Sequence, residues 1–134
     1  MKLFKSRRGN AVLDAALVLP ILLYLAFGTV EFGYYFYVKN TLQGAAREGV
    51  RAAIPAAANN DSVTTAVSNA MTAAGLQASG YTVTISPSNV SGQTEGTSIT
   101  VTVQCTWGSI GVRPMQLMSA SKVVKGQAVM RKEG

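Results

Sequence analysis

The strongest pattern in the chain is an apolar run near its beginning. No charged residue lies between Asp14 and Glu31, and the apolar character continues past Glu31 to Val38. Asp14 and Glu31 are separated by about 25 Å if the run is helical. That length suits a tilted or slightly mismatched membrane span. We therefore predict a membrane helix from residue 10 to residue 38, with Glu31 at its outer edge and the Tyr/Phe cluster beyond it as an interfacial aromatic belt.

Small and apolar residues recur at three- and four-residue steps after Val38. This spacing predicts that the same helix continues to about residue 54, where Pro55 ends it. A second, weakly amphipathic helix is predicted over residues 61–74. Its expected caps are Asn60 or Asp61 at the beginning and Gly75 at the end.

Alternation with period two then replaces the helical pattern. It predicts strands at about 81–86 and 98–106, separated by a turn region rich in Gly, Ser, Asn and Pro, and a third strand within 121–131. The predicted fold class is α+β. A long N-terminal transmembrane and amphipathic helix packs on a small antiparallel sheet, with one short extra helix.

Three regions follow from these elements. We expect a basic leader over residues 1–9, the membrane part of the long helix over 10–38, and an extracytoplasmic α+β domain over 39–134.

The positive charge of the chain is concentrated in the leader. The formal net charge is +6, and four of these charges come from Lys2, Lys5, Arg7 and Arg8. Positive flanks of membrane helices stay in the cytoplasm, which predicts a single-pass topology with the N-terminus inside and the C-terminal domain outside. No basic stripe interleaved with aromatic residues follows residue 51, so no nucleic-acid partner is expected.

The chain offers little material for catalysis. It has one cysteine and no histidine, and its six acidic residues are scattered. We predict no catalytic residue, metal ligand or cofactor-binding residue, and therefore no enzyme. Cys105 lies in a strand-like run and is interpreted as a buried thiol, with a reactive or intermolecular thiol as the alternative. Trp107 and Tyr81 are interpreted as core residues.

A cleaved secretory signal is an alternative to the membrane anchor. Signal peptidase could cut after Gly28, where Ala26-Phe27-Gly28 has the small-x-small form of its sites. Against this, the apolar run does not stop at Gly28, and Pro20 would lie at the centre of the signal.

The N-terminal sequence resembles the TadE-like pseudopilins of tight-adherence (type IVb, Flp-type) pilus systems. The similarity covers about residues 8–53 and is carried by several short segments. These are Arg8-Gly9-Asn10-Ala11, Ala16-Leu17-Val18-Leu19-Pro20-Ile21-Leu22-Leu23, Phe27-Gly28-Thr29-Val30-Glu31-Phe32-Gly33 and Ala45-Ala46-Arg47-Glu48-Gly49-Val50-Arg51-Ala52-Ala53. The closing Ala128-Val129-Met130-Arg131-Lys132-Glu133 is also similar to the usual ending of the family.

The resemblance implies cleavage by a prepilin peptidase between Gly9 and Asn10. Family members usually carry Glu five positions into the mature chain, and here that place is Asp14. Cleavage would create an α-amino group on Asn10, four residues from Asp14 on the same helix face. That amine, or one from a neighbouring subunit, would neutralise the acid; the alternative is an acid lying at the cytoplasmic interface near Arg8.

Two further residues are expected to serve assembly. Pro20 removes a backbone hydrogen bond and is predicted to loosen or kink the helix, as in assembled pilin-like filaments, unless it is an ordinary membrane-helix proline. Glu31 is the second acid of the anchor.

The resemblance implies a minor pseudopilin in the bacterial inner membrane. Its partners would be the prepilin peptidase, other pilin or pseudopilin subunits, the inner-membrane pilus assembly platform and the lipid bilayer. Two alternatives stay open: an uncleaved membrane-anchored binding or adhesion module, and an exported protein released after Gly28.

Overall fold

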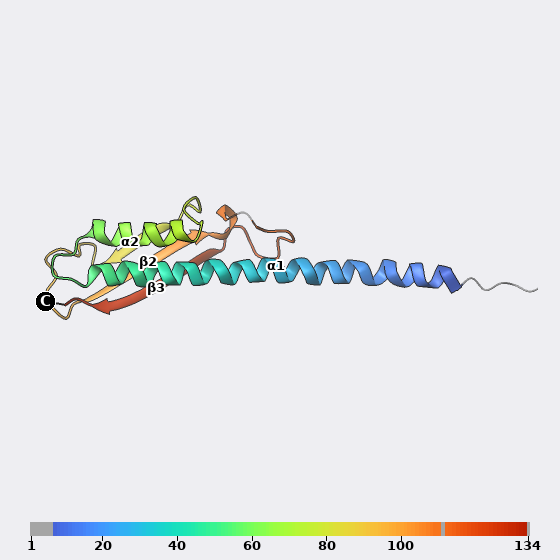
Figure 1. Cartoon of the computed structure of the whole chain (residues 1–134), viewed down its shortest axis with the longest axis horizontal. Coiled ribbons are helices and arrows are strands. Elements are labelled where there is room, and N and C mark those ends of the chain that lie inside the picture. The colour runs from blue at the N-terminus through green and yellow to red at the C-terminus, as the bar shows by residue number, and fades with distance from the viewer. Residues whose placement is uncertain (1–6, 111, 134) are drawn as a thin grey trace, which may run out of the picture.

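The computed structural model describes residues 7–110 and 112–133 and shows a long helix with a small domain packed along its C-terminal half (Figure 1). The helices are α1 (Arg7–Ala53) and α2 (Asn60–Ala73), the strands are β1 (Thr82–Ser86), β2 (Ser98–Thr106) and β3 (Val123–Arg131), and a 3-10 turn covers Trp107–Ser109. The three strands form one antiparallel sheet in the order β1-β2-β3. The predicted α+β fold class is therefore confirmed.

Helix α1 has 47 residues, which corresponds to about 70 Å. It continues through Pro20 as one element, and Figure 1 shows a nearly straight rod, so the predicted kink is not seen. The helix ends before Pro55, as predicted, because a residue that precedes proline disfavours the helical backbone. The C-terminal tail then binds the carbonyls beyond the helix end. The Glu133 N–H donates to the Ile54 carbonyl at 3.1 Å, and the Lys132 ammonium donates to the Pro55 carbonyl at 3.0 Å.

Both helices cover one face of the sheet. Along β2, alternate side chains face the helices and are buried: Ile99, Val101, Val103 and Cys105. The other face carries polar residues, mostly threonines, as the period-two pattern requires. Because one face is apolar and the other polar, a register slip of one residue would expose the whole apolar set.

Small residues let α1 approach the sheet and α2 closely. Gly49 lies where the three elements meet, and a Cβ added there would stand 2.6 Å from Cγ2 of Val67 and 3.1 Å from Cγ1 of Val101. Gly126 of β3 faces the α1 backbone at Leu42 and Gln43, with no room for a Cβ. The sequence-based expectation of a small-residue face on α1 is thus confirmed.

The caps of α2 differ in part from the prediction. Asn59, rather than Asn60 or Asp61, is the N-cap, and its Oδ1 accepts a hydrogen bond from the Ser62 N–H at 2.8 Å. Asn60 instead holds the loop before β2, because its side chain bonds both the Ser88 carbonyl and the Val90 N–H. At the other end Gly75 has φ +69°, and the Gly75 and Leu76 N–H groups bond to Thr72 and Met71, which is a Schellman ending.

Candidate functional site

The N-terminal half of α1 is exposed, and this surface is called the bare face of α1 below. Every residue from Ala11 to Phe27 is exposed, and the large apolar side chains in this stretch have exposed fractions between 42% and 71%. Soluble monomers rarely expose a contiguous apolar surface of this size. The helix is long and apolar enough to cross a membrane. This exposed stretch is the first part of the candidate site.

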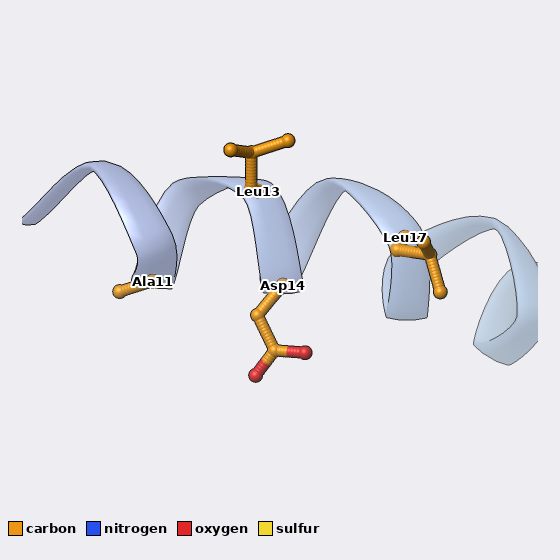
Figure 2. A pocket seen from close by; sticks show the side chains of 4 residues that line it. All are labelled: Ala11, Leu13, Asp14 and Leu17. Atoms are coloured by element: carbon orange, nitrogen blue, oxygen red, sulfur yellow. The ribbon is translucent and has the colours of Figure 1, made fainter.

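Asp14 is the one acidic residue within the exposed stretch. Figure 2 shows its carboxylate pointing away from the helix axis, opposite to Leu13, with Ala11 and Leu17 beside it. A carboxylate in these apolar surroundings has to be paired if lipid covers the helix. The exposed carboxylate of Asp14 is therefore accessible to a cation.

The predicted processing site lies at the beginning of the same helix. Gly9 and Asn10 both belong to the described backbone of α1. The predicted leader extends over residues 1–9, of which residues 1–6 lie outside the described part of the chain. Pro20 follows one and a half turns after Asp14, within the exposed stretch.

Glu31 has a different environment from Asp14. Its side chain is 0% exposed, and both carboxylate oxygens accept backbone hydrogen bonds, from the Met115 N–H at 3.2 Å and from the Met118 N–H at 3.1 Å. A buried carboxylate is tolerated when such bonds replace its hydration. Glu31 therefore fastens the segment before β3 to α1, and its predicted role in assembly stays a prediction.

The aromatic residues after Glu31 also contact the domain. The rings of Tyr34 and Tyr35 lie 6.0 Å and 5.5 Å from the ring of Trp107, and the Tyr37 hydroxyl donates to the Ala74 carbonyl at 2.8 Å. The α+β domain thus contacts α1 already at Tyr34, several residues before the predicted boundary between the membrane part (10–38) and the domain (39–134). Phe32 and Phe36 stay exposed, as an interfacial belt requires.

Replacing Glu31 should loosen the segment that it holds. In Glu31→Ala the Met115 and Met118 N–H groups lose their charged acceptor, an effect of about 1–3 kcal/mol. We expect hydrogen exchange at these two amides to accelerate by roughly fivefold or more, since about 1.4 kcal/mol corresponds to a tenfold change. Amide exchange measured by NMR in detergent micelles would test this.

The matched control is Glu48→Ala, which removes an exposed acid from the same helix. Surface changes of this kind shift stability by no more than about 0.5 kcal/mol, so both amides should keep their protection. Equal exchange in the parent chain and in Glu31→Ala would show that the carboxylate does not fasten the segment.

Cys105 is a buried residue of β2, in agreement with the predicted buried thiol. Burial raises the pKa of the thiol, which lowers the fraction of reactive thiolate at neutral pH. Trp107 is buried as well, and Tyr81 packs against the core, as predicted. Among the described residues no group of three His, Cys, Asp or Glu side chains is arranged to hold a metal ion.

The structure does not bring the two acids of α1 together. They lie on one straight helix about 25 Å apart, Asp14 exposed and Glu31 covered. Sequence reasoning missed the partners of Glu31, and it missed Gln43, whose amide bonds both the N–H and the carbonyl of Gln127 on β3. The helical pattern gave no signal for Gln43, because it places this residue on a different face from the small apolar residues.

These features define a class of protein: an α+β domain carried on an apolar helix of membrane-spanning length. Within that class, residues 9–51 match the family described as TadE-like protein, which is consistent with a TadE-like component of Tad pilus systems. The match covers about a third of the chain, all of it within α1, and confirms the resemblance found in the N-terminal sequence. Comparisons with curated proteins and with solved structures gave no match.

The family match bears on function at a coarse level. TadE-like proteins are structural pilus components and are not known as enzymes. The match therefore suggests a component associated with a Tad pilus, and the family as a whole implies interaction with other pilus components.

Proposed function

We propose that this chain is a minor pseudopilin, a membrane-inserted structural and assembly component of a tight-adherence type IV pilus or a related secretion apparatus. The observation that carries the proposal is an overlap along one helix. The TadE-like match spans residues 9–51 and includes the whole exposed apolar stretch of α1 from Ala11 to Phe27. The family similarity and the need for a membrane thus fall on the same helix.

In this proposal α1 crosses the bacterial inner membrane once. The basic leader keeps the N-terminus in the cytoplasm, and the α+β domain lies on the opposite side. The lipid bilayer, the inner-membrane assembly platform and other pilin or pseudopilin subunits are the partners of the bare face.

A prepilin peptidase would cut between Gly9 and Asn10. The new α-amino group on Asn10 has a reference pKa near 8, so it is largely protonated at neutral pH. The exposed carboxylate of Asp14 lies one turn further along α1. Pairing with this amine, or with that of a neighbouring subunit, would neutralise Asp14 within the membrane.

N-terminal mass spectrometry of the protein from native membranes tests this proposal against its alternatives. A mature chain that begins at Asn10 supports the pseudopilin. A chain that begins at Met1 would indicate an uncleaved membrane-anchored binding or adhesion module. A soluble chain that begins at Thr29 would indicate an exported protein released after Gly28.

Gly9→Val should abolish processing. A peptidase needs an extended backbone at the cut, and the absence of a side chain at Gly9 allows this backbone to enter the active site closely. The branched side chain of Val would occupy that space, so the variant should accumulate as a full-length, membrane-held precursor in the same spectra.

The control for this variant is Gly33→Val, another glycine of α1 with open space around its Cβ position. It should be cut like the parent chain. Normal processing of Gly9→Val would contradict the assignment of the cleavage site and leave the membrane anchor itself unaffected.

A further inference from the structure

The segment from Val112 to Met118, here called the 112–118 loop, precedes β3 and lies against α1. Figure 1 shows it as the part of the domain that reaches furthest toward the N-terminal half of α1. Phe27 and Val30 of α1 line a surface hollow together with Val112, Arg113 and Pro114. Leu117 covers Gly28, with its Cδ1 3.5 Å from the position of an added Cβ.

Two features fix the position of the loop along α1. The buried carboxylate of Glu31 accepts the Met115 and Met118 N–H groups. Between these donors Gln116 has φ +51°, a left-handed backbone that turns the chain so that both N–H groups reach one carboxylate. The loop is thus fixed to α1 by backbone hydrogen bonds, and these bonds do not use the side chains of Val112, Arg113 and Leu117.

Several of those side chains are apolar and exposed. Val112 is 39% exposed and Leu117 is 52% exposed. They stand beside Phe27 and Val30, which are 45% and 53% exposed and belong to the bare face of α1. The loop therefore extends the apolar surface of the helix sideways at the level where that surface meets the domain.

The charge that is not covered by backbone hydrogen bonds near the loop is positive. Arg113 lies within it, and the Lys122 ammonium stands 4.9 Å from the ring centroid of Tyr35. No acidic residue occurs between Glu95 and Glu133 in the sequence, and Glu31 is covered by its hydrogen bonds. Basic residues next to a membrane helix are attracted to anionic lipid headgroups.

We propose that the 112–118 loop is a second membrane contact of this protein. Leu117 and Val112 enter the boundary between headgroups and acyl chains next to α1, and Arg113 binds lipid phosphate at the same leaflet. The contact sets the height and rotation of the domain on the membrane, which a single helix leaves free. The inference rests on the proposed insertion of α1, and its occupant is the leaflet that α1 crosses.

Depth-dependent quenching in vesicles tests the loop and the anchor separately. The full chain, with Cys105→Ala as background, carries one fluorescent label on a new cysteine and is reconstituted in phosphatidylglycerol vesicles that contain doxyl-labelled lipids. Leu117→Cys reports the loop, Leu19→Cys reports the span, and Ser91→Cys reports an exposed loop of the domain that should stay in water. Trp107 fluorescence confirms that each labelled chain is folded.

We expect label 117 to be quenched by shallow doxyl groups, label 19 by deep ones, and label 91 by neither. Adding Arg113→Ala should reduce quenching at 117 in phosphatidylglycerol vesicles and leave it unchanged in phosphatidylcholine vesicles, because only the former present net negative headgroups.

Quenching at 19 without quenching at 117 would overturn the loop contact and leave the anchor intact. Quenching at neither position would overturn the proposed insertion of α1, and the loop contact with it. If label 117 is unquenched in vesicles and protected only in cells that contain the other pilus components, the loop binds protein rather than lipid and the proposal is wrong.

Discussion

Gly126→Val should unfold the α+β domain under conditions in which the parent chain is stable. A Cβ at position 126 would overlap backbone atoms of Leu42 and Gln43 in α1, and the backbone of a packed helix has little room to move. Overpacking of a core costs about 1–3 kcal/mol or more, and a clash with backbone belongs at the upper end. The stability of a small domain is only about 5–15 kcal/mol.

The same substitution separates β3 from α1. The side-chain amide of Gln43 accepts a hydrogen bond from the Gln127 N–H at 3.2 Å and donates one to the Gln127 carbonyl at 2.7 Å. These bonds satisfy backbone groups on the outer edge of β3. Pushing β3 away breaks both bonds and exposes that edge, which favours aggregation. We therefore expect a large fall in the urea midpoint, measured by the fluorescence of Trp107, the only tryptophan in the chain.

Gly44→Ala is the matched control, one residue after Gln43. An added Cβ there meets nothing within 4 Å, and alanine favours a helix over glycine by about 0.5–1 kcal/mol. The midpoint should stay the same or rise. An unchanged midpoint for Gly126→Val would show that α1 and β3 do not approach as closely as described.

Local patterns were sufficient to predict the elements of the fold. The alternation in 98–106 and the turn-rich region before it predicted a hairpin, and Pro55 predicted the end of α1, because these signals act over a few residues. The predicted N-cap of α2 was wrong because four residues of the types that cap helices, Asn59 to Ser62, stand in a row. Tertiary contacts decided between them, since Asn60 is engaged by Ser88 and Val90.

The environment of Glu31 was beyond the reach of local patterns. Its hydrogen-bond donors lie 84 and 87 positions further along the chain, and the irregular sequence between Trp107 and Gln116 gave no sign of where it would fold. Gly126 offered a better signal, because a glycine inside a strand marks a close backbone approach. A contact between residues far apart in the sequence can thus be anticipated where one of them is of an unusual type for its element, as Gly126 is within β3.

Asp14→Ala should leave the domain folded and abolish association with other pilus subunits. Asp14 lies on the bare face of α1, far from the packed core, so the urea midpoint of Trp107 fluorescence should not change. If the acid pairs with an α-amine in the membrane, its loss removes an interaction of about 1–3 kcal/mol. Asp14→Glu keeps the charge and should be tolerated.

Two measurements decide the role of Asp14: the N-terminal mass of the membrane protein, and its co-purification with the other subunits. A variant that is cut between Gly9 and Asn10 but no longer co-purifies supports the pairing role. If Asp14→Ala is cut and co-purifies like the parent chain, Asp14 is an interfacial acid without a part in assembly. The contrast with Glu31 is the physical basis of this prediction, because the Met115 and Met118 N–H groups satisfy the buried carboxylate of Glu31, whereas the carboxylate of Asp14 is exposed.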